Sequence, residues 1–595
     1  MTELKWWQTA VFYQIYPRSF ADGNGDGIGD FKGIIQKLDY LSDLGVDAIW
    51  LSPHFSSPNW DCGYDISDYT NVAPEYGTLD DFKNFLAEAH KRNMRVILDL
   101  VLNHTSDEHP WFLESRSSRD NPKSDWYVWM DSPRTVEDRA SSRSEAEGGA
   151  GVRVPPNNWQ SCFDGDAWTY APERDQYYYH YFMKQQPDLN WHNPAVKKAM
   201  WDAARFWLDL GVDGYRLDAI GTIYEDPKLT SHKVPMDLAE LRRASELAQT
   251  PAEKKKMGKY WHDMFKHQWG GAGLHDLMKE LRAVLNEYDG DRMLVGEDDD
   301  IRYMGNGDDE LHLVFNFPLM RTERITPAHV RVNQKERLAQ LEALPLNGWP
   351  CNTLGNHDTS RVYTRYTDKK HDADLARLHA ALVLTLKGTP FLYDGEEIGM
   401  TDLVITDPAR LRDTMATWYY DRLVNELNVD PEEAARRAGQ MSRDKNRTPM
   451  QWTDDPNGGF SPREIETWLP VNPNHQTGIN VKEQGRNPNS LLNYYKHLLQ
   501  VRRNTPALIE GEYISLHKAA KNYLAFLRVT SKQTVLVILN FSDARLALDF
   551  SRTKEIRQSG LRILFSSAER SARIKSPRGL EIGPFEAFIA EVQEK

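Results

Sequence analysis

Short apolar runs that end in polar residues recur along the chain, with longer amphipathic stretches between them. This alternation is typical of strands and helices that take turns along a parallel sheet. Helical periodicity is clear, for example, in Leu79–Arg92 and Pro194–Leu210. The candidate strands are Val11–Pro17, Ala48–Pro53, Arg95–His104, Gly214–Ala219, Met293–Asp298, Leu313–Leu319, Cys351–Asp358 and Thr389–Glu397. Eight such units predict an α/β fold that closes into a (β/α)8, or TIM, barrel.

Two gaps between the predicted strands are too long for plain connections. Residues 105–181, rich in Trp and Tyr, predict an inserted subdomain, domain B, after the third strand. Residues 401–468 predict an excursion after the eighth strand that overhangs the same face of the barrel. From about residue 513 the runs become β-rich without long helices, which predicts a C-terminal antiparallel β-sandwich over 513–595. The barrel then comprises residues 1–104 and 182–512.

Composition narrows the class of partner. The formal charge is −14 and the Lys and Arg residues are scattered, so we expect neither nucleic acid nor a membrane surface as partner. Three widely spaced cysteines, Cys62, Cys162 and Cys351, fit neither a disulfide framework nor a zinc site. No run of about 18 apolar residues occurs. We therefore expect a soluble cytoplasmic protein, a monomer or a weak homo-oligomer.

The ends of the predicted strands four and five offer the two carboxyl groups that acetal cleavage requires. Period-two alternation places Arg216 and Asp218 on the same side of their strand, so a guanidinium would keep a nucleophilic carboxylate ionised. Glu297 follows an apolar strand, where partial burial and nearby anionic groups would raise its pKa towards use as a general acid.

A third carboxylate stands at the end of the predicted strand seven, where Thr353–Arg361 contains His357 and Asp358. Each of these carboxylates alone is ambiguous, since a carboxylate beside an arginine is more often a structural ion pair. Together they occupy the C-terminal ends of barrel strands, where TIM-barrel chemistry resides. The sequence therefore predicts one site that contains all three.

Four motifs carry a family resemblance: Asp99-Leu-Val-Leu-Asn-His104, Gly214-Tyr-Arg-Leu-Asp218, Val295-Gly-Glu297 and Asn356-His-Asp358. With them the chain resembles the α-amylase family of glycoside hydrolases, in its oligo-1,6-glucosidase and α-glucosidase branch. The resemblance implies an exo-acting α-glucosidase that retains configuration by double displacement. Asp218 would form the glucosyl-enzyme, Glu297 would act as acid and base, and Asp358 would bind glucose hydroxyls.

The same resemblance implies further substrate-binding residues. Tyr64 and Asp65 would form the floor of the glucose pocket, with Tyr64 stacked on the sugar, and His104, Arg216 and His357 would line it. Arg447, in Asn446-Arg-Thr-Pro-Met-Gln-Trp452, would help to close the pocket. The alternative for Arg447 is an ordinary surface charge in a loop.

The segment Asp22–Asp30 alternates side-chain oxygens with glycines, as a hard cation requires. An EF-hand is excluded because its twelfth position would be Gly33 instead of Glu. The resemblance implies one structural Ca²⁺, and a magnesium-occupied or empty turn is the alternative. We expect no organic cofactor. The implied ligands are Asp22, Asn24, Asp26, the carbonyl of Ile28, and Asp30.

The expected substrate is a disaccharide or small oligosaccharide, because Gln186–Asn190 matches a short motif of this branch. Ala219 stands where members that prefer α-1,6 bonds commonly have valine, which favours α-1,4-linked or sucrose-like substrates and leaves α-1,6 bonds as an option. Sucrose isomerases are the main rival, but their basic motif has no clear match in Phe317–Glu323. Transporter heavy-chain ectodomains and non-catalytic sugar-binding proteins are rivals from other classes, and the three retained carboxylates argue against both.

Overall fold

The computed structural model describes residues 4–132, 153–163, 165–556 and 559–593. Within these ranges eight strands form one parallel sheet in the order β13-β12-β11-β5-β2-β1-β15-β14. The strands are β1 (Phe12–Ile15), β2 (Ala48–Leu51), β5 (Arg95–Val101), β11 (Gly214–Asp218), β12 (Met293–Gly296), β13 (Leu313–Val314), β14 (Cys351–Thr353) and β15 (Thr389–Tyr393). The predicted eight-stranded α/β barrel is confirmed.

Most strands begin close to their predicted starts and end earlier than predicted, so the polar residues that follow them lie in loops above the barrel. The seventh strand ends at Thr353 instead of Asp358, and the sixth, which was predicted to reach Leu319, ends equally early at Val314. The next residues form a short helix, α11 (Phe317–Met320). Pro318 suits the first turn of a helix because it has no N–H to leave unpaired. Between the two end strands of the sheet, Asn316 donates to Oδ1 of Asn352 (3.1 Å).

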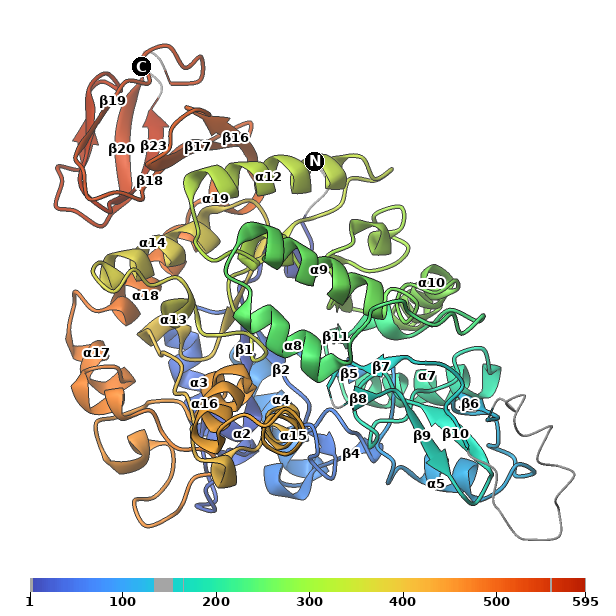
Figure 1. The fold of residues 1–595 in the computed structure, drawn as a ribbon. Helices are drawn as coiled ribbons and strands as arrows, with labels where there is room; N and C mark the ends of the chain where they lie inside the picture. Colours follow the sequence, from blue (N-terminus) through green and yellow to red (C-terminus); the bar gives the residue numbers. More distant parts are fainter. Residues whose placement is uncertain (1–3, 133–152, 164, 557–558, 594–595) are drawn as a thin grey trace, which may run out of the picture.

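Helices surround the sheet (Figure 1). In α3, Asp30 caps the first turn by accepting from the N–H of Gly33, and Gly45 ends the helix with φ of 97°. Its apolar residues Ile34, Leu38 and Leu41 face the core and are fully buried. The larger barrel helices are α3 (Phe31–Leu44), α4 (Leu79–Lys91), α7 (Pro194–Asp209), α10 (Leu274–Leu285), α12 (Pro327–Glu342), α14 (Asp372–Thr385) and α18 (Leu491–Arg503). Shorter ones are α1 (Trp6–Thr9), α2 (Pro17–Phe20), α13 (Val362–Arg365), α17 (Val481–Arg486) and α19 (Pro506–Glu510).

The insertion after β5 contains α5 (Pro110–Ser117) and a three-stranded antiparallel sheet in the order β6-β10-β9. Its aromatic residues mainly pack against one another: Trp159, Trp168 and Tyr179 belong to one buried cluster. An isolated bridge from Tyr127 to Leu189 ties it to the barrel, and beside it His104 bridges to Asp188. The strands are β6 (Trp129–Met130), β7 (Gln160–Ser161), β8 (Gly165–Asp166), β9 (Trp168–Ala171) and β10 (Gln176–Tyr179).

The C-terminal region is an antiparallel β unit, at the opposite end of the molecule from β9 and β10 in Figure 1. Its six-stranded sheet has the order β16-β17-β18-β23-β20-β21, and β19 pairs with β22. Leu536, Ile538 and Phe588 lie in the buried cluster between them. The strands are β16 (Glu512–Leu516), β17 (Tyr523–Val529), β18 (Thr534–Asn540), β19 (Leu546–Leu548), β20 (Gly560–Ser566), β21 (Arg573–Ile574), β22 (Leu580–Ile582) and β23 (Ala587–Gln593).

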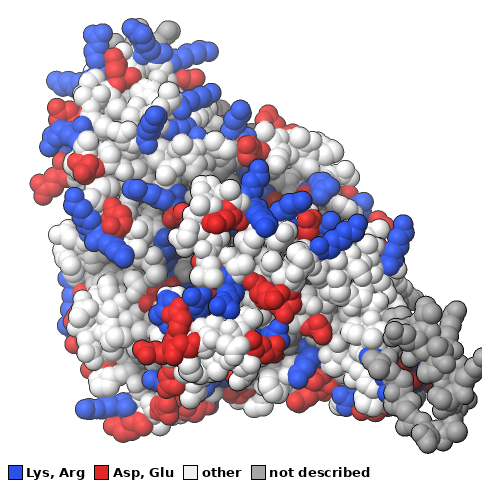
Figure 2. Space-filling view, viewed as in Figure 1, with Lys and Arg blue, Asp and Glu red and all other residues white. Residues whose placement is uncertain are grey.

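The excursion after β15 forms α15 (Thr414–Asn425), α16 (Pro431–Met441) and the 3-10 turn η6 (Arg443–Asn446). In Figure 1 α15 and α16 lie in front of the barrel beside α8 (Leu238–Leu247), and α9 (Pro251–Phe265) lies near α8. Figure 2 shows acidic and basic side chains interspersed over this face, without a large patch of one sign. Across the described ranges, no helix combines the length and apolar character needed to cross a bilayer.

Candidate active site

One guanidinium joins three carboxylates at the C-terminal ends of neighbouring strands. Nη1 of Arg216 lies 2.6 Å from Oδ1 of Asp99 and 2.6 Å from Oδ1 of Asp218, and Nη2 lies 2.6 Å from Oε2 of Glu297. Arg216 is the register partner of Asp99 across β5 and β11, and it is two residues before Asp218 on the same side of β11. The predicted pairing of Arg216 with Asp218 is therefore present. We call these four residues the Arg216 group.

Burial controls how the acids of this group titrate. Burial raises the pKa of Asp218 to about 7 and that of Asp99 to about 6, although Arg216 opposes both shifts. Burial also raises the pKa of Glu297 to about 8, against Arg216 and with a contribution from Asp218. The upward shift predicted for Glu297 agrees with this result. Arg216 favours the ionised form of Asp218, as predicted, but burial is the larger effect on the pKa of Asp218.

The three predicted carboxylates nevertheless reach solvent, which a reacting group must do. The side chains of Asp218, Glu297 and Asp358 are 9%, 23% and 31% exposed. Ala219, which follows Asp218, adopts a left-handed conformation with φ of 38°. Its N–H thereby donates to Oε2 of Glu297 (2.9 Å). The turn after β11 thus connects the nucleophile candidate to the acid/base candidate.

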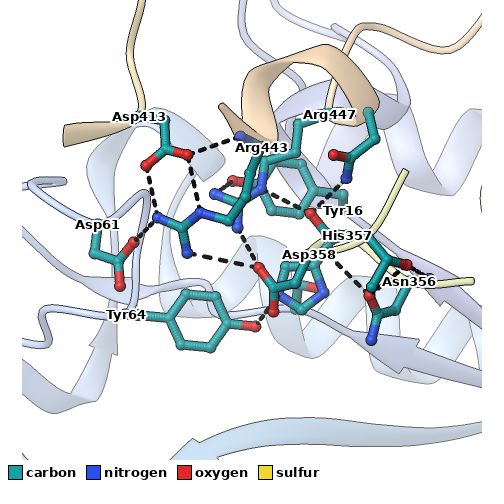
Figure 3. Close-up of polar contacts among 12 residues, drawn as sticks. Tyr16, Asp61, Tyr64, Asn356, His357, Asp358, Asp413, Arg443 and Arg447 are labelled. Carbon is teal, nitrogen blue, oxygen red and sulfur yellow. Dashed lines mark hydrogen bonds and ion pairs between the residues drawn. The ribbon is translucent and has the colours of Figure 1, made fainter. Parts of the chain in front are cut away.

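Asp358 lies in a different electrostatic setting, which Figure 3 displays. Its Oδ1 is 2.6 Å from Nη2 of Arg447 and 3.6 Å from Nη1 of Arg443. Arg443 also contacts Asp61 (2.8 Å) and Asp413 (2.9 Å). Burial raises the pKa of Asp358, but His357 and the two guanidiniums outweigh it and hold this pKa well below its usual range. We call Asp61, Asp358, Asp413, Arg443 and Arg447 the Arg443–Arg447 group.

Arg447 is fully buried, so its interpretation as a surface charge is wrong. Its Nε donates to the carbonyl of His357 (3.0 Å), and its guanidinium packs over the ring of Tyr16 at 5.3 Å. The excursion after β15 thereby fixes both the backbone and the carboxylate of the His357–Asp358 segment.

The predicted aromatic and histidine residues meet at the same place. Oη of Tyr64 donates to Oδ2 of Asp99 (3.1 Å) and lies 2.6 Å from Nε2 of His357. Nε2 of His104 lies 3.1 Å from the carbonyl of Tyr64. Burial lowers the pKa of His104 to about 3 and takes that of His357 well below its usual value, so both rings are neutral near pH 7.

Asp65 is the predicted site residue that the structure does not bring to the others. It is fully buried, and its carboxylate accepts from Ser57 and from the N–H groups of Trp60 and Asp61, all in its own loop. Asp61 is the carboxylate of this loop that contacts Arg443. It also accepts from Nε2 of Gln186 (3.2 Å).

Sequence reasoning also missed Asp61, Asp99, Asp413, Arg443 and Gln186 as members of the site, although Asp99 opens one of the four family motifs. Gln186 had a signal, since it opens the motif Gln186–Asn190, and its Nε2 is 3.0 Å from Nε2 of His104. Arg443 stands four residues before Arg447 in the same segment, so the motif that identified Arg447 lies beside it. Asp61 lies in an irregular loop and Asp413 caps the first turn of α15, so no periodicity indicates that either carboxylate faces the site.

The predicted calcium segment forms a tight loop in which side-chain oxygens accept backbone N–H groups. Asp22 accepts from Gly25 (2.5 Å) and Gly27 (2.8 Å), and Asp30 from Gly33 (2.7 Å). The carboxylate and amide oxygens are the ligand type that Ca²⁺ prefers. Among the residues with described positions, no group of three or more His, Cys, Asp or Glu side chains is gathered as a metal site. The calcium assignment stays a prediction.

Comparison with known proteins agrees with this geometry. Residues 14–511 match the alpha amylase catalytic domain. The chain is 39% identical to the oligo-1,6-glucosidase of Parageobacillus thermoglucosidasius, with 91% of each chain covered, and 39% identical to a probable alpha-glucosidase of Rhizobium meliloti, with 90% of each covered. A mutant isomaltulose synthase of Erwinia rhapontici NX5 in complex with sucrose superposes with a TM-score of 0.82 at 34% identity, with both chains fully covered. The protein is thus an enzyme, a glycoside hydrolase that belongs to the α-amylase family.

Proposed function

We propose that this enzyme releases glucose from the non-reducing end of short α-glucosides, with retention of configuration, by double displacement. The observation that carries this proposal is the contact of one guanidinium, that of Arg216, with both Asp218 and Glu297 at 2.6 Å. Retaining glycosidases hold their two carboxyl groups about 5–5.5 Å apart, close enough for one to attack while the other protonates. A separation in that range is our prediction for Asp218 and Glu297.

In the first step, the protonated carboxyl of Glu297 donates its proton to the glycosidic oxygen. The carboxylate of Asp218 attacks the anomeric carbon as the bond to the leaving group breaks. The products are the free aglycone alcohol and a β-glucosyl ester of Asp218. Burial suits Glu297 to this step, because it raises the pKa of Glu297 to about 8 and keeps the proton available near pH 7.

In the second step, the ionised Glu297 takes a proton from water while the water oxygen attacks the anomeric carbon. The ester bond breaks, Asp218 returns as a carboxylate and glucose leaves. Arg216 stabilises the negative charge on Asp218 in the free state. Because Oδ1 of Asp218 accepts a hydrogen bond from Nη1 of Arg216, we assign the attack on the sugar to Oδ2.

Asp358 has the task of binding sugar hydroxyls as a permanent anion. Its low pKa keeps it ionised near neutral pH, where Glu297 gives up its proton in the first step and regains one in the second. Hydrogen bonds from a neutral hydroxyl to a carboxylate are among the stronger kinds. Asp61 and Arg443 add an acceptor and a donor beside it, which suits a ligand with several adjacent hydroxyl groups.

For the substrate we favour α-1,4-linked or sucrose-like glucosides, with α-1,6 bonds as an option. Ala219 supports this choice because its small side chain follows Asp218 and its N–H contacts Glu297. Relatives with the name oligo-1,6-glucosidase support the α-1,6 option, and the sucrose complex of the isomaltulose synthase supports sucrose.

Initial rates on maltose, isomaltose, sucrose, trehalose and maltotriose, with product identification, test the proposal. We expect glucose with initially retained α configuration from at least one of them. Release of β-glucose as the first product would contradict the retaining mechanism.

Sucrose isomerisation is the second candidate, and the structural similarity to an isomaltulose synthase favours it. In that reaction the glucosyl-enzyme is attacked by a different hydroxyl of the retained fructose instead of water. Isomaltulose or trehalulose from sucrose without net glucose release would replace hydrolysis by this function.

A further inference from the structure

The imidazole of His357 has a hydrogen-bonding partner on each nitrogen. Its Nδ1 lies 2.6 Å from Nε2 of Gln14, a fully buried residue of β1. Its Nε2 lies 2.6 Å from Oη of Tyr64 and 3.2 Å from Oδ2 of Asp358. Because a neutral imidazole carries one N–H and one lone pair, these contacts depend on which nitrogen holds the proton.

When the amide nitrogen of Gln14 faces the ring, each hydrogen bond from Ser52 through His357 to Asp99 has a donor and an acceptor. Gln14 donates one proton to Oγ of Ser52 (3.0 Å) and the other to Nδ1 of His357. The ring then carries its proton on Nε2 and donates it towards Asp358 and Tyr64. The hydroxyl of Tyr64 is free to donate to Asp99 (3.1 Å).

The flipped amide gives a worse arrangement. Oε1 of Gln14 would accept from the N–H at Nδ1 of His357, and Nε2 of the ring would be unprotonated and carry a lone pair. That lone pair would face the anionic oxygen of Asp358 at 3.2 Å. The Tyr64 hydroxyl would have to donate to the ring, which removes its proton from Asp99. In the favoured orientation the only cost is Oε1 of Gln14, a buried oxygen without a partner among the described residues.

We propose that Gln14 is a positioning residue that sets the tautomer of His357: its amide donates to Nδ1 and so keeps the imidazole proton on Nε2. That proton links Asp358 to Tyr64, and through Tyr64 to Asp99 and Arg216. The link joins the Arg443–Arg447 group to the Arg216 group. Gln14 itself is expected to touch neither the substrate nor the reacting atoms.

Two substitutions distinguish the effect of the Gln14 amide N–H from the effect of the size of the Gln14 side chain. Gln14→Glu has nearly the same size but presents a carboxylate, which accepts from Nδ1–H and so reverses the tautomer. Gln14→Met fills similar space with neither donor nor acceptor. Gln484→Met is the matched control, because Gln484 is a buried glutamine on α17 that donates to the carbonyl of Ile398, away from the site.

The tautomer is measured by NMR of ¹⁵N-histidine-labelled full-length protein, with the His357 signals assigned from their loss in His357→Asn. We expect Nε2–H in the wild type and in Gln484→Met, and Nδ1–H in Gln14→Glu. We also expect kcat on a nitrophenyl α-glucoside to fall about 10- to 100-fold in both Gln14 variants, with a smaller change in KM.

A wild-type spectrum with the proton on Nδ1 would overturn the proposal. Wild-type kcat in both folded Gln14 variants would overturn it as well, with folding checked by circular dichroism. The kinetic arm rests on the proposed α-glucosidase function, whereas the NMR arm does not. Inactive wild-type protein with Nε2–H would therefore refute the proposed function alone.

Discussion

The two charged groups of the site differ in the balance of their charges. The Arg216 group has three carboxylates and one guanidinium, whereas the Arg443–Arg447 group has three carboxylates and two guanidiniums. Both are buried, so desolvation pushes every acid towards its neutral form. In the first group desolvation prevails and the pKa values of Asp99, Asp218 and Glu297 all rise.

In the second group the outcome is reversed for two acids, by His357 and both guanidiniums at Asp358 and by the guanidiniums at Asp413. The pKa of Asp358 lies well below its usual range, and that of Asp413 falls to about 2 because Arg443 and Arg447 outweigh burial. Burial still raises the pKa of Asp61, which lies at the edge of this group. The number of guanidiniums beside the carboxylates thus contributes to separating the acids that titrate near neutral pH from Asp358 and Asp413, which stay ionised.

The largest expected effect comes from removal of the nucleophile. Asp218→Asn should lower kcat on a nitrophenyl α-glucoside by about 10⁴-fold or more, because no glucosyl ester can form. Initial rates measure this loss, and thermal unfolding checks that the variant folds. Asp298→Asn is the matched control, since Asp298 is a neighbouring carboxylate whose Oδ1 accepts from the N–H groups of Asp299 and Asp300. Comparable activity in Asp218→Asn and the wild type would refute the assignment.

Exchange of the arginines tests the comparison directly. Arg216→Lys keeps the charge but loses the fork that reaches three carboxylates, so we expect kcat/KM to fall about 10²-fold or more. The acid limb of its pH profile should move to higher pH, because Asp218 loses part of its contact with the Arg216 guanidinium. Arg447→Lys should cost less and leave that limb in place, since Asp358 keeps Arg443. Equal shifts in both variants would mean that the two groups act as one.

The pH profile of kcat/KM in the wild type follows from the raised pKa values. Asp218 must be ionised and its pKa is raised to about 7, so activity should be lost as the pH falls through that value. Glu297 must be protonated and its pKa is raised to about 8, so activity should be lost as the pH rises through that value. The maximum should lie between the two limbs, which belong to the coupled pair and not to either residue alone. A plateau that extends down to pH 5 would contradict the Arg216 group as described.

The sequence predicted more of the Arg216 group than of the Arg443–Arg447 group, for a physical reason. Arg216, Asp218 and Glu297 lie on or directly after apolar strands, where periodicity and barrel geometry place them together. Arg443 lies in the short turn η6, Asp413 caps α15 and Asp61 lies in a loop, and the positions of these segments depend on tertiary packing. The choice of Asp65 instead of Asp61 shows the limit, because four residues within one loop decide whether a carboxylate faces the site or its own backbone.

The pKa values of the site carboxylates were less predictable from the sequence than the positions of these residues. The contact of Arg216 with Asp218 followed from strand alternation, but the net pKa shift depends on how much water the barrel excludes. The prediction for the sixth strand failed for a similar reason: its apolar run continues past Val314, and the helix at Phe317–Met320 depends on Pro318 and on contacts with β14.

The smallest effect concerns the loop of residues 22–30, which lies outside both groups. If it binds Ca²⁺, removal of the ion with EDTA should lower the melting temperature by about 2–5 °C, since a ligand that binds only the folded state stabilises it by mass action. Asp26→Asn should abolish this calcium dependence, whereas Asp43→Asn, a carboxylate change on the outer face of α3, should not. The pH profile of kcat/KM should be the same with and without calcium, because neither guanidinium group includes this loop. A calcium-dependent shift of either limb would show that the charge balance of the Arg216 group is not set locally.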